Sequence, residues 1–89
     1  MGTSCYATVK NERGIHARPS SVIAKEALKY KSNITIQFNG KTANAKDVLQ
    51  IIMLELFVGS VVTITVSGDD QEAALEEVKK TVEKEYSFE

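Results

Sequence analysis

An Asn-Gly pair separates two strand-like stretches of this chain and constrains its fold most strongly. Residues 33–38, NITIQF, carry an apolar side chain at every second position, and Asn39-Gly40 follows directly. Alternation with a period of two is typical of a half-buried strand, and Asn-Gly is the strongest short-range signal for a hairpin turn. The sequence therefore predicts a β-hairpin whose second, short strand lies at about residues 41–45.

Two further stretches alternate in the same way, CYATVK at residues 5–10 and VVTITV at residues 61–66. Together with the hairpin they make four strands, and each of the three alternating strands has one apolar and one polar face. We expect the Ile and Val rows to face a core. The polar alternates are expected to face water: Thr35, Gln37, Thr63 and Thr65.

Three stretches show helical signals between these strands. Apolar residues recur at three- and four-residue steps from Ala17 to about Tyr30. Asp47 can cap a brief helix that ends near Leu54. After the last strand, Asp69 with Glu72 resembles a capping box and precedes an apolar stripe for a final helix. The predicted order of elements is βαββαβα.

This order predicts an α+β fold, an open-faced β-sandwich in which helices cover one face of a four-stranded antiparallel sheet. A chain of 89 residues has room for one modest core. No linker, repeat or low-complexity tract interrupts it. We therefore expect a single domain spanning residues 1–89.

Charge and composition exclude several classes of function. The chain has 11 basic and 12 acidic side chains, a net charge of −1, so no bulk field attracts nucleic acid or an anionic membrane. No stretch is long enough to span a bilayer. Cys5 is the only cysteine, which rules out an internal disulfide and favours a cytoplasmic protein. One His and one Cys without a ligand cluster predict no metal site.

The stretch GIHARPS contains the only histidine and the only proline of the chain. If a helix begins at Ala17, His16 occupies its N-cap region and Pro19 falls in the first turn, where the missing N–H costs little. A helix start presents unpaired N–H groups and a partial positive charge, which together favour an anion such as phosphate. His16 is therefore expected to lie at an anion site.

An imidazole attacks a phosphoryl group only when it is neutral, and the positive end of a helix disfavours the imidazolium. A phosphorylated His16 would lie beside the N–H groups of Ala17 and Arg18 and beside the Arg18 guanidinium, whose donors match phosphate oxygens. These groups stabilise the charge without adding chemistry. They suit a phosphoryl carrier with a covalent phosphohistidine and no cofactor, rather than a stand-alone catalyst.

The sequence resembles the histidine-containing phosphocarrier protein (HPr) family of the bacterial phosphoenolpyruvate:sugar phosphotransferase system. The resemblance rests on four stretches: Gly14 to Pro19, Asn39-Gly40-Lys41, Ala45-Lys46 and Gly59 to Gly68. It implies that His16 accepts a phosphoryl group on its Nδ1 atom from phosphorylated enzyme I, which obtains it from phosphoenolpyruvate. It also implies that His16 passes the group to an enzyme IIA domain.

The run VLQIIMLELFV at residues 48–58 is apolar except for Gln50 and Glu55. A short helix cannot bury apolar side chains on every side, so part of the run is expected to form an exposed docking patch. We expect Leu54, Leu56 and Phe57 to belong to the core. The resemblance implies that the following residues dock both enzyme I and enzyme IIA: Val48, Leu49, Ile52 and Met53, with Ser21 and Lys25 on the rim.

The sequence departs from the family at the start of this helix. Many relatives carry a regulatory serine directly after Lys46, and here that residue is Asp47. Without a hydroxyl acceptor, we expect no modification by HPr kinase at this position. Asp47 could cap the helix or partly imitate a phosphoserine, although one carboxylate carries less charge than a phosphate, and we favour the cap. Gln50 and Glu55 replace small residues of many relatives and could alter which partners dock.

Other interpretations are also open. His16 could be a structural N-cap residue, Arg18 a solvated one, and residues 48–58 entirely core. A regulatory binding module of the same fold would act by docking to proteins, in a nitrogen-related branch or in catabolite control. We expect a monomer, with weak self-association conceivable through the apolar run.

Overall fold

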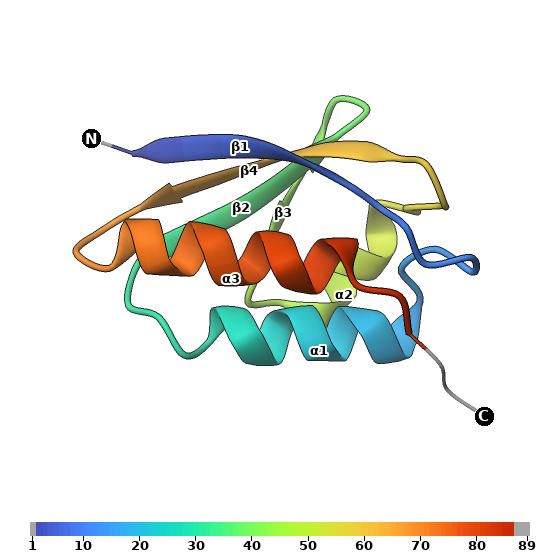
Figure 1. Ribbon diagram of the computed structural model, residues 1–89, viewed down its shortest axis with the longest axis horizontal. Helices are drawn as coiled ribbons and strands as arrows, with labels where there is room; N and C mark the ends of the chain where they lie inside the picture. The colour runs from blue at the N-terminus through green and yellow to red at the C-terminus, as the bar shows by residue number, and fades with distance from the viewer. Residues whose placement is uncertain (1, 87–89) are drawn as a thin grey trace.

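A computed structural model describes residues 2–86 of the chain. Its elements follow the predicted order, and neighbouring strands pair antiparallel in the spatial order β1-β4-β2-β3 (Figure 1). The α+β prediction is confirmed. The elements are β1 (Thr3–Thr8), α1 (Ala17–Ala27), β2 (Asn33–Phe38), β3 (Lys41–Asn44), α2 (Val48–Met53), β4 (Val61–Ser67) and α3 (Gln71–Glu83).

The three helices form one layer against one face of the sheet (Figure 1). Helix α1 packs against both α2 and α3, while α3 covers β1 and β4 and α2 covers β3. Figure 1 also shows that α2 lies toward the end of the molecule at which α1 begins. The start of α1 and the whole of α2 therefore occupy the same region.

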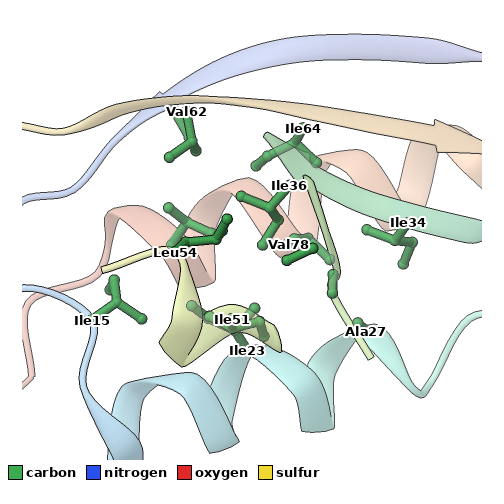
Figure 2. Packing of buried hydrophobic residues seen from close by; sticks show 14 of the residues in the cluster. Ile15, Ile23, Ala27, Ile34, Ile36, Ile51, Leu54, Val62, Ile64 and Val78 are labelled. Atoms are coloured by element: carbon green, nitrogen blue, oxygen red, sulfur yellow. The ribbon is translucent and has the colours of Figure 1, made fainter. Parts of the chain in front are cut away.

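The core lies between the sheet and the helices (Figure 2). Alternate residues of the strands point into it, because a period of two places every second side chain on the same face. Ile34, Ile36 and Ile64 are buried there, as predicted. The helices contribute Ile23, Ala27, Ile51 and Val78, and the loops contribute Ile15 and Leu54.

The opposite face of the sheet is more accessible. Gln37 is exposed, and Thr35, Thr63 and Thr65 are intermediate in burial. Tyr6 is exposed on β1, whereas its neighbour Ala7 is buried. The predicted alternation of the strands is therefore confirmed.

The hairpin between β2 and β3 is confirmed in detail. Asn39 has φ 53° and Gly40 has φ 79°, so both central residues are left-handed, as in a type I′ turn. Phe38 pairs with Lys41 across it. Asn and Gly adopt positive φ at low cost, which explains why this pair makes the tight connection.

Several predicted boundaries and roles were wrong. Strand β1 ends at Thr8 rather than residue 10, and α1 ends at Ala27, which leaves Leu28 exposed as the C-cap instead of buried on the apolar face. Asp69 does not start the last helix, because the N-cap is Asp70.

The Asp70 carboxylate makes no capping bond to α3. It accepts instead from the backbone N–H groups of Lys31 and Ser32 at 2.9 and 3.0 Å, and from the Ser32 hydroxyl. The predicted capping box of Asp69 and Glu72 therefore fails because the N-cap lies one residue later, at Asp70, and the Asp70 carboxylate binds the loop before β2 instead of capping the helix.

Candidate functional site

His16 is the N-cap residue of α1, as predicted, and its side chain is exposed. Its backbone is extended, with φ −99° and ψ −161°, and its imidazole makes no capping hydrogen bond to the helix. The Ser20 N–H donates to the His16 carbonyl at 2.9 Å as the first bond of the helical ladder. The exposed His16 therefore lies at the positive end of the helix dipole.

The residues just before His16 are anchored to the segment that follows α2. The Ile15 N–H donates to the Leu56 carbonyl at 3.1 Å, and the Ile15 side chain is buried. Gly14 has φ 72°, and a Cβ at this position would lie 2.3 Å from the same carbonyl oxygen. Glycine is required here for both conformation and space.

Ala17 and Arg18 are the first two residues of α1, and both are exposed. Their amides precede the first ladder bond, and the next residue, Pro19, has no N–H and is buried. The first turn contains no acidic residue. The positive charge of Arg18 is unfavourable at the positive end of the helix dipole unless an anion binds nearby. The charges of the first turn are therefore those of an anion-binding site.

The predicted docking residues lie on α1 and α2, which pack against each other. Leu49 is 64% exposed and Met53 62% exposed, while Ile51 is fully buried. The alternative that the whole apolar run belongs to the core is therefore wrong. Val48 and Ile52 are intermediate in burial, and Ser21 and Lys25 are exposed on α1.

The prediction that Phe57 belongs to the core was wrong. Its side chain is 60% exposed, whereas Leu54 and Leu56 are buried as expected. Glu55 adopts φ 57°, so the chain leaves the helical path there and Phe57 falls on a surface turn. Its ring meets that of Phe38 edge to face, with 5.9 Å between centroids.

Asp47 caps α2, in agreement with the sequence interpretation. Its carboxylate accepts from the Gln50 backbone N–H at 3.2 Å and from the Gln50 side-chain amide at 3.3 Å. Gln50 Oε1 in turn accepts from the Asn44 N–H at 2.8 Å. Gln50 thus ties α2 to the end of β3, a structural role that the sequence reasoning missed.

The sequence reasoning also missed Asn11, a buried polar residue that hydrogen-bonds the loop leading to His16. An Asn followed three residues later by Gly was the available signal, since this pattern is typical of a type I β-turn. Its position near the C-terminal segment could not be read from the sequence.

Within residues 2–86, no group of three or more His, Cys, Asp or Glu side chains is placed to hold a metal ion. Across the same residues, no helix combines the length and the apolar character needed to cross a membrane.

Residues 3–84 match the family model described as "PTS HPr component phosphorylation site". The chain is 40% identical over 76 residues to the phosphocarrier protein HPr of Mycoplasma capricolum subsp. capricolum, which covers 85% of each chain. Its fold is similar to the crystal structure of HPr from Bacillus anthracis, with a TM-score of 0.88, 35% identity, and coverage of 92% of this chain and 98% of that one.

A further similar structure is described as an HPr dimer, from Thermoanaerobacter tengcongensis. Its TM-score is 0.68 at 36% identity, and the match covers 79% of this chain and 80% of that one. The predicted monomer is thus not decided by the similar structures.

Proposed function

The chain belongs to the HPr family of the phosphotransferase system, and on that premise we propose that it carries a phosphoryl group on His16 between two protein partners. The observation that carries this proposal is the exposed imidazole at the N-cap of α1, directly before the first bond of the helical ladder. The donor is phosphorylated enzyme I and the acceptor an enzyme IIA domain of a sugar phosphotransferase system.

The proposed chemistry is a displacement at phosphorus. An unprotonated ring nitrogen of His16, the Nδ1 atom by resemblance, forms a bond to phosphorus while the bond to the donor breaks with its electron pair. Transfer to the acceptor reverses these roles. Neither transfer step requires this chain to hold a cofactor or a metal ion.

The start of α1 stabilises the charge that arrives with the phosphoryl group. A phosphoryl group adds about two negative charges near neutral pH. The helix dipole, the amides of Ala17 and Arg18 and the Arg18 guanidinium offset this charge, and the first turn has no acidic residue to oppose it. The site is open to solvent, so these interactions stay moderate and the group remains transferable.

The partners would dock beside His16 on the exposed side chains of α2. Leu49 and Met53 present apolar surface there, and α1 supplies the polar rim through Ser21 and Lys25. Because α2 packs on α1, one face of the molecule can present both the docking patch and the reactive ring. The same face can then serve the donor and the acceptor in turn.

The proposal is tested by incubating the protein with phosphoenolpyruvate, Mg²⁺ and a catalytic amount of enzyme I. We expect an adduct that is labile in acid and stable in base, as for phosphohistidine, and that is absent in His16→Ala. Circular dichroism should show that both proteins are folded. A folded wild-type chain that stays unlabelled would contradict the carrier function.

We also propose that the carrier works as a monomeric single domain in the cytoplasm, since a partner protein must reach the ring and the apolar patch together. Light scattering coupled to size exclusion, at the concentration of the transfer assay, distinguishes monomer from dimer.

A further inference from the structure

Asn11 closes the turn that leads to His16. The Gly14 N–H donates to the Asn11 carbonyl at 2.9 Å, and the Asn11 side-chain amide donates to the Gly14 carbonyl at 2.8 Å. Both polar groups of Gly14 are therefore bound by the same residue. Asn11 itself is 4% exposed, so water does not readily replace these bonds.

The same side chain binds the C-terminal segment. Asn11 Oδ1 accepts from the Tyr86 N–H at 2.8 Å, although the two residues are 75 positions apart. The Tyr86 hydroxyl donates at 2.6 Å to the carbonyl of Thr81, in the last turns of α3. Figure 1 shows the segment after α3 descending beside the start of α1.

These contacts specify asparagine. The position needs one acceptor toward Tyr86 and one donor toward Gly14 on a short side chain. A carboxylate would supply the acceptor only, and an apolar side chain neither.

We infer that Asn11 is a positioning residue for phosphoryl transfer, which holds the Gly14–Ile15 entry in place and braces it against the C-terminal segment. This inference rests on the proposed function of His16. The Ile15 N–H is bound to Leu56 on one side and the Gly14 peptide to Asn11 on the other, so the backbone that presents His16 is held from two directions. Transfer rates are sensitive to small displacements of a reacting group.

The test compares Asn11→Ala with wild type in transfer from phosphorylated enzyme I. We expect the rate at saturating donor to fall about tenfold, because the ring is less well placed, while KM stays within about twofold. The docking side chains on α2 are unchanged in this variant, which is why KM should be preserved. Rates are corrected for the folded fraction.

Ser32→Ala is the matched control for lost stability. Ser32 is also buried and its hydroxyl also binds a distant segment, through Asp70, but it lies beyond the far end of α1. Loss of the Ser32 hydroxyl should leave the transfer rate per folded molecule unchanged. An equal rate loss in Ser32→Ala would overturn the inference, because general loosening would then explain both.

The contact with the C-terminal segment is tested by a pair of variants at Tyr86. Tyr86→Ala and Tyr86→Pro both remove the ring, but only proline removes the N–H that binds Asn11. We expect the transfer rate of Tyr86→Pro to lie about threefold below that of Tyr86→Ala. Equal transfer rates in the two variants would show that the hydrogen bond from the Tyr86 N–H to Asn11 does not contribute to positioning His16.

A spectroscopic measurement separates this inference from the proposed function. In Asn11→Ala, but not in Ser32→Ala, we expect shifted NMR signals for the His16 ring and the amides of residues 14–18, together with lower backbone order parameters. Unchanged signals and an unchanged rate would overturn the inference while the carrier function stands. If wild type accepts no phosphoryl group, the proposed function fails, and the NMR comparison still decides whether Asn11 positions the ring.

Discussion

The backbone N–H of Ile15 donates to the carbonyl of Leu56 at 3.1 Å, which fixes the residue before His16 to the segment after α2. The residue that precedes the proposed phosphorylation site is therefore linked directly to the segment that follows the apolar helix α2. A change on either side of this hydrogen bond should affect how the ring is presented.

Gly14→Ala should destabilise the fold, because a Cβ at this position would lie 2.3 Å from the Leu56 carbonyl oxygen and 2.9 Å from the Phe57 Cα. Both atoms belong to the backbone and cannot rotate away. We expect a loss of at least about 2 kcal/mol in the free energy of unfolding, measured with urea. Gly40→Ala is the matched control.

Gly40 also has a positive φ, 79°, but nothing lies within 4 Å of a Cβ there. Gly40→Ala should therefore cost about 1 kcal/mol, from the backbone conformation alone. Equal losses in the two variants would show that the contact with Leu56 is unimportant.

Ser20→Ala should stabilise the protein. Ser20 is fully buried in α1, and its hydroxyl has no hydrogen-bond partner within the described part of the chain, residues 2–86. Removing an unsatisfied buried hydroxyl and adding a better helix former should raise the free energy of unfolding by about 0.5–1 kcal/mol. Thermal and urea unfolding measure the change.

The contrast for Ser20→Ala is again Ser32→Ala, whose hydroxyl does have a partner. This variant should lower the free energy of unfolding by about 1 kcal/mol. If Ser20→Ala lowered the free energy of unfolding by as much, the Ser20 hydroxyl of the wild-type protein would have to form a hydrogen bond in solution.

Asp70→Asn should weaken the acid dependence of stability. Hydrogen bonds from the Ser32 hydroxyl and the Lys31 N–H hold the pKa of Asp70 below its ordinary value. Because the pKa of Asp70 is lower in the folded state than in the unfolded state, the ionised carboxylate stabilises the fold fully at pH values above its unfolded-state pKa. This stabilisation is lost as the pH falls below about 4 and then through the pKa of Asp70 in the folded protein.

We expect Asp70→Asn to melt at a lower temperature than wild type at pH 7, and the difference to narrow on acidification toward pH 2. Melting temperatures across this range provide the measurement. Two curves that stay parallel throughout would show that the Asp70 carboxylate contributes nothing to acid unfolding.

Leu49→Asp and Met53→Lys should impair transfer without unfolding the protein. Both native side chains are largely exposed on α2, so the free energy of unfolding should change by less than about 0.5 kcal/mol. If the patch docks enzyme I, a charge there should raise KM about tenfold with little change at saturating donor. Steady-state transfer kinetics separate the two effects.

The control for the docking variants is Leu28→Asp. Leu28 is 64% exposed, as Leu49 is, but it caps the C-terminal end of α1, away from His16. Its KM should match that of wild type. A similar rise in KM at Leu28 would mean that any added charge on the surface, rather than loss of the patch, hinders docking.

The sequence by itself determined the features that depend on neighbours along the chain. Asn39-Gly40 forces a tight turn because both residues accept positive φ, and the alternation around it assigns each side chain to a face. His16 was predictable at the start of α1, because Pro19 fits only the first turn of a helix. Residues 14–19 also carried the family resemblance.

Tertiary structure alone decided which distant groups meet. Asp70 rather than Asp69 precedes the last helix, and its carboxylate binds the loop before β2. Phe57 is exposed because the backbone turns at Glu55, which no periodicity indicates. The bond between Asn11 and Tyr86 spans nearly the whole chain. Local sequence patterns indicate which secondary structure a segment prefers and which face each side chain occupies. Hydrogen bonds between distant residues depend instead on which segments the packed core brings together.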